Sequence, residues 1–163
     1  MNLILVRHAD AAPADGYADD SLRPLTRKGR EVQAQVAKAL KTMGLVPDRV
    51  FCSPRVRAVE TAEITAEGLG GPEPEELRVL DGGFPTAELV RALDRFGPDG
   101  TLMCVGHEPD MGIWAAELLS GEARMRVRFR KSAVLGLSFD GLPALGGATL
   151  QYFYRPKDLA ALV

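Results

Sequence analysis

Three short runs of apolar residues stand out along the chain, and each ends where polar residues begin. They cover residues 3–6, 50–52 and 101–105. Apolar runs of this length, bounded by polar residues, are typical of parallel strands buried on both faces of a sheet. We therefore expect three parallel strands in the core of the protein.

Segments with helical spacing of apolar positions follow these strands. Thr26 is placed to cap a helix that carries Val32, Val36, Leu40 and Met43 on one face, before a stop at the Gly and Pro of residues 44–47. Further helices are predicted over residues 54–68, 85–96 and 110–121, the first of them capped by Ser53. A short strand is expected at 77–80.

The C-terminal part of the chain has a different pattern. Arginine alternates with apolar residues over 124–130, which predicts an extended segment with its four arginines on one face. Strands are expected at 134–139 and 149–154. The whole order of elements predicts an α/β sandwich with a mostly parallel sheet. Because no linker or low-complexity tract interrupts it, we expect one domain over residues 1–163.

Composition and charge exclude several classes of protein. The 163 residues include 20 basic and 22 acidic ones, for a net charge of −2, so no overall field attracts nucleic acid or an anionic membrane. Cys52 and Cys104 lie in apolar runs without ligand-type spacing, which argues against disulfides and structural zinc. The apolar stretch at the N-terminus is too short for a signal sequence or a membrane span. We expect a reduced, cytoplasmic protein.

The two histidines of the chain occupy equivalent places. His8 and His107 each follow a predicted buried strand, as does the Ser53-Pro54 turn. Ligands of open α/β sheets bind beyond the carboxyl ends of the strands, so these segments should face one crevice. Arg7 adjoins His8, and Arg55 and Arg57 lie in the first turns of a helix, where the backbone already favours an anion. The sequence therefore predicts a phosphate site.

Four segments carry a resemblance to a known family. They are residues 5–11, 23–29, 53–61 and 105–109, which read LVRHADA, RPLTRKG, SPRVRAVET and VGHEP. In this order they resemble the histidine phosphatase superfamily, and within it the small phosphohistidine phosphatases of the SixA-like group. The resemblance covers residues 2 to about 140. It implies a phosphoglycerate-mutase-like fold, a three-layer α/β/α sandwich with a mostly parallel central sheet.

The resemblance also implies a mechanism. His8 would attack the phosphoryl group and become phosphohistidine, while Arg7 and Arg57 bind its oxygens and His107 donates a hydrogen bond in the transition state. Arg23 is a further candidate for phosphate binding, at the rim. The scheme needs no metal or cofactor. The partner it implies is a signalling or phosphotransfer protein that carries phosphohistidine.

The proton donor is left open by the sequence. Glu108 follows the second histidine, where one branch of the superfamily carries an acid, but it is equally a helix-start carboxylate that complements the helix dipole. Asp81, after the middle strand, is the other candidate. A histidine leaving group needs far less protonation than an alkoxide, so a missing acid would favour phosphohistidine. Ala9 replaces the usual glycine after the nucleophile, which makes that loop less permissive.

Two alternative functions stay open, and so does the role of the arginines in residues 124–130. The same site suits a phosphatase of a small phosphorylated metabolite, or, with less support, a phosphoprotein-binding module without turnover. The arginines of 124–130 form either a charged sheet edge that resists aggregation or a docking stripe for an acidic phosphoprotein. Oligomeric state is not indicated.

Overall fold

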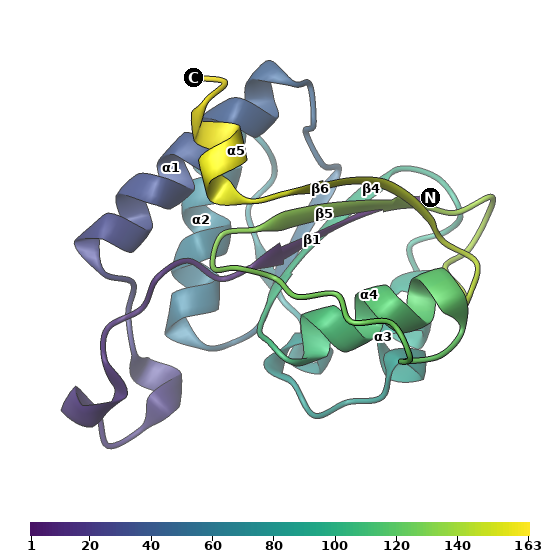
Figure 1. Ribbon diagram of the computed structural model, residues 1–163, viewed down its shortest axis with the longest axis horizontal. Coiled ribbons are helices and arrows are strands. Elements are labelled where there is room, and N and C mark those ends of the chain that lie inside the picture. The colour runs from purple at the N-terminus through teal and green to yellow at the C-terminus, as the bar shows by residue number, and fades with distance from the viewer.

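A single six-stranded sheet organises the computed structural model, which describes residues 1–163 (Figure 1). The strand order is β3-β2-β4-β1-β5-β6. β1 pairs parallel with β4, β4 with β2 and β2 with β3, whereas β5 pairs antiparallel with β1 and β6 pairs antiparallel with β5. The strands are β1 (Asn2–Arg7), β2 (Arg49–Cys52), β3 (Glu75–Glu76), β4 (Thr101–Gly106), β5 (Val134–Ser138) and β6 (Thr149–Tyr154). The predicted mostly parallel sheet is confirmed.

Helices cover both faces of this sheet. One face carries α1 (Arg27–Thr42), α2 (Val56–Leu69) and α5 (Pro156–Ala160), and the other carries α3 (Thr86–Asp94) and α4 (Asp110–Ser120) (Figure 1). Successive residues of β1 enter opposite cores: Leu3 and Leu5 pack toward α3 and α4, Ile4 and Val6 toward α1 and α2. Burial on both faces explains the unbroken apolar runs, and the three-layer sandwich is confirmed. None of the helices combines the length and apolar character needed to cross a bilayer.

The long loop before α1 is fixed at its base. Thr26 caps α1 as predicted, because its Oγ1 accepts a hydrogen bond of 2.9 Å from the amide of Gly29. The Asp10 carbonyl accepts another from the amide of Thr26, at 2.9 Å. A Cβ atom at Gly29 would lie only 2.2 Å from that carbonyl oxygen, so only glycine allows the two segments to meet. This contact anchors residues 10–25 beside the carboxyl ends of the strands.

One predicted strand is wrong, and so is one of the two roles considered for the arginines of residues 124–130. Residues 77–80 do not form a strand: after the short β3, the chain turns into a 3-10 helix over Arg78–Asp81. The turn buries Leu77, Val79 and Leu80 in one core, which the alternating faces of a strand could not do. Residues 124–130 pair with no strand of the sheet, whose edges are β3 and β6. The role of a protective sheet edge therefore does not apply to these arginines.

The start of α2 also differs from the prediction. The residue before its first turn is Arg55, and no side chain caps the helix. Ser53 accepts a weak hydrogen bond from the Arg55 amide at 3.3 Å, but the closer partner of its hydroxyl, at 2.8 Å, is the His107 ring. Ser53 is thus a residue of the candidate site.

We predict that Gly29→Ala destabilises the protein. In an open helical position this change would add about 0.5–1 kcal/mol of stability. Here the new methyl group meets the Asp10 carbonyl, and overpacking of this kind costs about 1–3 kcal/mol. Urea unfolding measures the difference. Gly16→Ala is the control, because a Cβ there meets nothing within 4 Å, and equal stability of the two variants would refute the prediction.

Candidate functional site

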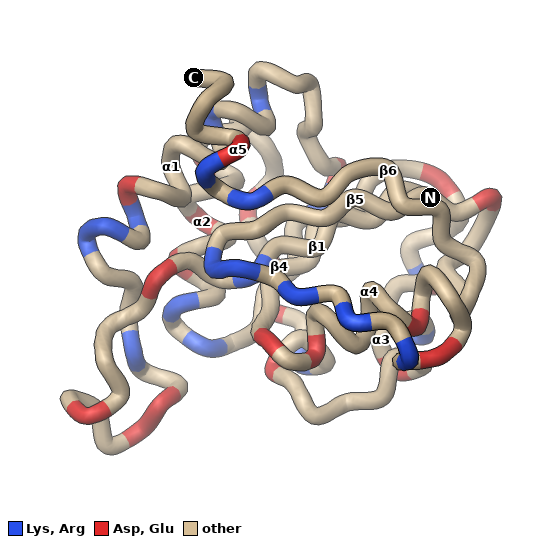
Figure 2. The backbone as a smooth tube through the Cα atoms, viewed as in Figure 1, with Lys and Arg blue, Asp and Glu red and all other residues tan.

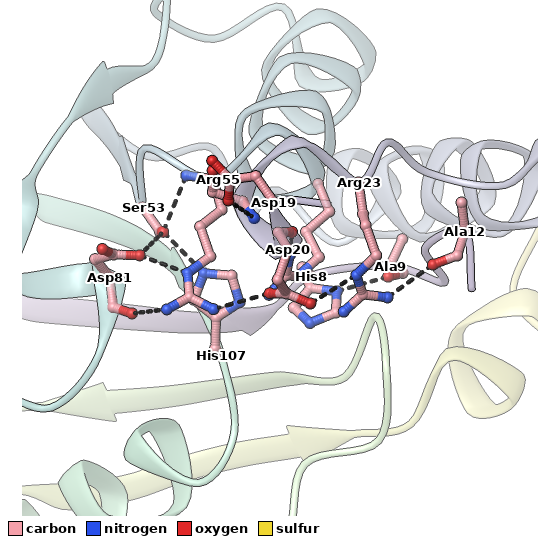
Figure 3. A network of polar contacts seen from close by, with 12 residues as sticks. His8, Ala9, Ala12, Asp19, Asp20, Arg23, Ser53, Arg55, Asp81 and His107 are labelled. Atoms are coloured by element: carbon pink, nitrogen blue, oxygen red, sulfur yellow. Dashed lines mark hydrogen bonds and ion pairs between the residues drawn. The ribbon is translucent and has the colours of Figure 1, made fainter. Parts of the chain in front are cut away.

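Strand pairing brings the two histidines together. Arg7 of β1 lies opposite Gly106 of β4, so the residues that follow them, His8 and His107, leave the sheet at the same level. Their ring centroids are 5.0 Å apart, and the His8 amide donates to the Gly106 carbonyl at 3.0 Å. Figure 3 shows the two rings side by side, with Ser53 against His107. Both rings are buried.

His8 is held as a neutral base. Its Nδ1 lies 2.7 Å from the Ala9 carbonyl oxygen, which can only accept, so Nδ1 carries the proton and Nε2 presents a lone pair. Burial lowers the pKa of His8 to about 4, and the positive charges of Arg57, Arg7 and Lys131 act in the same direction. The imidazole is therefore unprotonated at neutral pH, as a nucleophile must be.

His107 is connected to a chain of polar side chains behind it. Its Nε2 lies 2.8 Å from Ser53 Oγ, and Ser53 Oγ in turn lies 3.4 Å from Asp81 Oδ1. Arg55 Nε donates to the same carboxylate oxygen at 2.6 Å. Burial lowers the pKa of His107 to about 3, with further contributions from His8 and Arg57. The Nδ1 atom of His107 is buried and has no hydrogen-bond partner.

Two arginines, the half-buried Arg7 and the buried Arg57, complete the surroundings of His8. Arg7 Nη1 donates to the Phe129 carbonyl at 2.8 Å, and Arg57 donates from Nη1 to the Asp20 carbonyl, also at 2.8 Å. Burial lowers the pKa of each guanidinium. The Nε atoms of Arg7 and Arg57 are buried without a partner. Unpartnered buried donors are rare and costly, so these two, with Nδ1 of His107, fit an anion bound against His8.

Asp20 is a site residue that the sequence analysis missed. It lies in a 3-10 turn (Asp20–Leu22), and its carboxylate contacts three arginines: Arg57 Nη2 at 2.9 Å, Arg55 Nη1 at 3.2 Å and Arg23 Nε at 2.7 Å. Although burial opposes it, the hydrogen bonds from Arg57 and Arg23 lower the pKa of the Asp20 carboxyl. The sequence shows a polar loop here, and only the spacing of three residues from Arg23 hinted at a pairing.

The remaining predicted residues lie at different depths. Arg23 reaches the network through Asp20, and its Nη1 donates to the Ala12 carbonyl at 2.7 Å, so it ties the loop together at the rim. Arg55 bridges Asp20 and Asp81. Ala9 is buried with ordinary negative φ, and its amide donates to Thr61 Oγ1 at 3.0 Å. Glycine is therefore not required at that position.

The carboxylate of Glu108 is directed to backbone amides. Oε1 accepts from the Phe129 amide at 2.5 Å and Oε2 from the Gly112 amide at 3.3 Å. These bonds join the segment after α4 to the start of that helix. Asp81, the other candidate acid, is the carboxylate connected to the histidine pair, through Ser53.

Neither cysteine takes part in this site. Cys52 and Cys104 are free thiols buried in the sheet, and burial raises the pKa of each to about 12. Thiolates are the nucleophilic form of cysteine, so both thiols are chemically inert.

Comparisons with known proteins point to one family. Residues 3–82 match the model of the histidine phosphatase superfamily (branch 1). The chain is 34% identical to the phosphohistidine phosphatase SixA of Escherichia coli strain K12, over 98% of this chain and 96% of that protein. An uncharacterized protein of Picosynechococcus is 36% identical over 84% of each chain.

Solved structures show the same fold. The protein histidine phosphatase SixA complexed with tungstate superposes with a TM-score of 0.83 at 29% identity, over 98% of this chain and 99% of that one. A phosphoserine phosphatase from Entamoeba histolytica, complexed with 3-phosphoglyceric acid, superposes with a TM-score of 0.72 at 18% identity, over 97% and 98% of the two chains. The likeness to the second protein concerns the fold alone.

We predict that the two histidines make the protein sensitive to mild acid. Free histidine has a pKa of about 6.5, so the unfolded chain binds two protons as pH falls, while the folded protein does not until about pH 4 for His8 and about pH 3 for His107. The free energy of unfolding has its full value above pH 6.5 and decreases as pH falls toward 4. At pH 5 the expected loss is about 2 kcal/mol for each histidine.

Urea unfolding between pH 8 and pH 4.5 measures this loss. The double variant His8→Gln, His107→Gln should have a shallower dependence of stability on pH, whatever its stability at pH 8. The same slope in both proteins would show that other groups cause the acid sensitivity.

Proposed function

Because the chain belongs to the histidine phosphatase superfamily and is a phosphatase of its SixA-like group, we propose that it dephosphorylates phosphohistidine in a protein, with His8 as nucleophile. The observation that carries this proposal is the neutral His8 imidazole, whose ring centroid lies 5.0 Å from that of His107 and whose pKa is lowered by the nearby charges of Arg57 and Arg7. A nucleophile and a ring of donors are what phosphoryl transfer requires. We place the reaction in the cytoplasm, in keeping with two free thiols.

The reaction proceeds in two steps. In the first, Nε2 of His8 bonds to phosphorus and the phosphorus–nitrogen bond of the substrate breaks. The substrate ring, protonated by water on its other nitrogen, keeps the electron pair of that bond and leaves as neutral imidazole. Arg7 and Arg57 donate to the phosphoryl oxygens as charge moves onto them. In the second, water attacks phosphorus, the bond to His8 breaks, and phosphate leaves. His8 returns to its neutral form without a metal or cofactor.

His107 stabilises the phosphoryl group from the other side. When the Ser53 hydroxyl donates across the 2.8 Å contact to Nε2 of His107, the ring proton resides on Nδ1. Nδ1 is the atom without a partner in the protein, so it is free to donate to a phosphoryl oxygen. Ser53 thus sets the tautomer of His107, and the Arg55 amide, which donates to Ser53 Oγ at 3.3 Å, holds the hydroxyl in place.

The engaged carboxylates favour phosphohistidine over an alkyl phosphate. Glu108 accepts from two backbone amides, and Asp81 is paired with Arg55. Neither is poised to protonate a leaving group. An imidazole, with a pKa of about 6.5, leaves with little help, whereas an alkoxide needs an acid. We therefore propose a phosphohistidine-carrying signalling or phosphotransfer protein as substrate, in preference to a small phosphorylated metabolite.

We predict that phosphate release requires His8 and no metal. In EDTA the protein should release phosphate from a phosphohistidine protein domain, and His8→Ala should lower the rate about a thousandfold or more. His8→Ala must retain the fold by circular dichroism. A panel of phosphate esters is assayed in parallel. Preference for one ester would identify a metabolite phosphatase, and binding of the phosphoprotein without release would identify a binding module.

We predict that Glu108 is not the proton donor. Glu108→Gln should change kcat for the phosphohistidine domain and for aryl or alkyl phosphates by less than about threefold, because the carboxylate is bound to the amides of Phe129 and Gly112. A general acid contributes about a hundredfold or more, chiefly with alkyl esters. A loss of that size, confined to the alkyl esters, would restore Glu108 to the catalytic role.

A further inference from the structure

A groove of about 480 Å³ lies beside Arg7 and takes no part in the proposed chemistry. One side is formed by the start of α4, including Ile113, and the other by the segment that follows α4, including Met125 and Val127. The apolar residues of both sides are accessible to a ligand, since Ile113 is 41% and Met125 45% exposed. Arg7 contributes to both the groove and the surroundings of His8, so the groove opens next to the reacting group.

The segment that follows α4 forms one wall of this groove, and it is hydrogen-bonded to residues of the candidate site. Phe129 is fully buried and anchors the segment in the core. Its carbonyl accepts from Arg7 Nη1 at 2.8 Å, and its amide donates to Glu108 at 2.5 Å. Arg7, which precedes His8, and Glu108, which follows His107, therefore fix the position of this wall. A molecule bound along it has a defined place relative to His8.

Three arginines along the wall have no acidic partner. Arg126, Arg128 and Arg130 are exposed and form no ion pair, in contrast to Arg124, whose Nε lies 3.0 Å from Glu122. Figure 2 shows the basic positions spaced along the chain between α4 and β5. The charges of Arg128 and Arg130 also act on Arg7, whose pKa they help to lower. Positive charge thus accumulates beside the groove in a chain whose net charge is −2.

We propose that this groove binds an acidic, partly apolar segment that flanks the phosphohistidine of the substrate protein; the inference rests on the proposed function. Carboxylates of the segment pair with Arg126 and Arg128, and its apolar side chains contact Ile113 and Met125. A concave, apolar floor suits side chains of a protein. It gives no contact to a nucleic acid backbone, and it does not protrude as a membrane-binding surface does.

The test separates docking from chemistry with two substrates. The variant Arg126→Ala, Arg128→Ala is compared with wild type on a phosphohistidine domain with acidic flanking residues and on phosphoimidazole. We expect kcat/KM for the domain to fall about tenfold, mainly through KM, and kcat/KM for phosphoimidazole to stay within about twofold. The control Lys38→Ala, Arg91→Ala removes the same charge from exposed positions on α1 and α3 and should behave as wild type.

Salt and a groove variant sharpen the result. Raising the salt concentration should lower kcat/KM of wild type for the domain and affect the double variant less. Ile113→Asp should reduce activity toward the domain but spare phosphoimidazole, which tests the groove separately from the arginines. Equal losses on both substrates, or no loss on the domain, would overturn the proposal. So would tighter binding of polyuridylate or of phosphatidylglycerol vesicles than of an acidic protein segment.

A binding measurement distinguishes failure of docking from failure of the proposed function. A fluorescent peptide of alternating glutamate and leucine is titrated into wild type and into the double variant. If wild type hydrolyses neither phosphohistidine nor phosphoimidazole, the proposed function fails. The groove is then judged by the peptide alone: weaker binding by the double variant supports it, and equal binding refutes it.

Discussion

The parallel pairing of β1 with β4 is the constraint on which the site depends. Because Arg7 lies opposite Gly106, His8 and His107 emerge at one level, close enough for their rings to meet at 5.0 Å. Both rings are also buried away from water. That burial keeps both imidazoles neutral at neutral pH and so gives His8 its lone pair. Register and desolvation together turn two separated histidines into one reactive pair.

Much of the positive charge around this pair is balanced by one carboxylate, that of Asp20. Asp20 contacts Arg57, Arg55 and Arg23, and so holds three guanidiniums that would otherwise repel one another. It contacts Arg57 through both Nη atoms, while the buried Nε atom has no partner. The loop of residues 10–25 is in this way part of the site.

Phosphate chemistry and substrate choice occupy neighbouring surfaces. Arg7 belongs to both, since it adjoins His8 and also borders the groove after α4. Phe129 holds that groove in place through its backbone and its buried ring. A family of enzymes with a common site can acquire different substrates when such adjoining segments change, because the contacts to the phosphoryl group are left intact.

The sequence by itself determined the layers and the strand ends and indicated the residues that we propose for the phosphate site, because buried strands, caps and four local motifs are properties of short segments. It could not supply Asp20, the contact of Ser53 with His107, or the attachment of Glu108 to Phe129. Each joins segments far apart in the chain, and no local pattern reports such a contact. The turn at 78–81 and the unpaired segment at 124–130 were missed for the same reason. Only packing decides whether an alternating segment finds a strand to pair with.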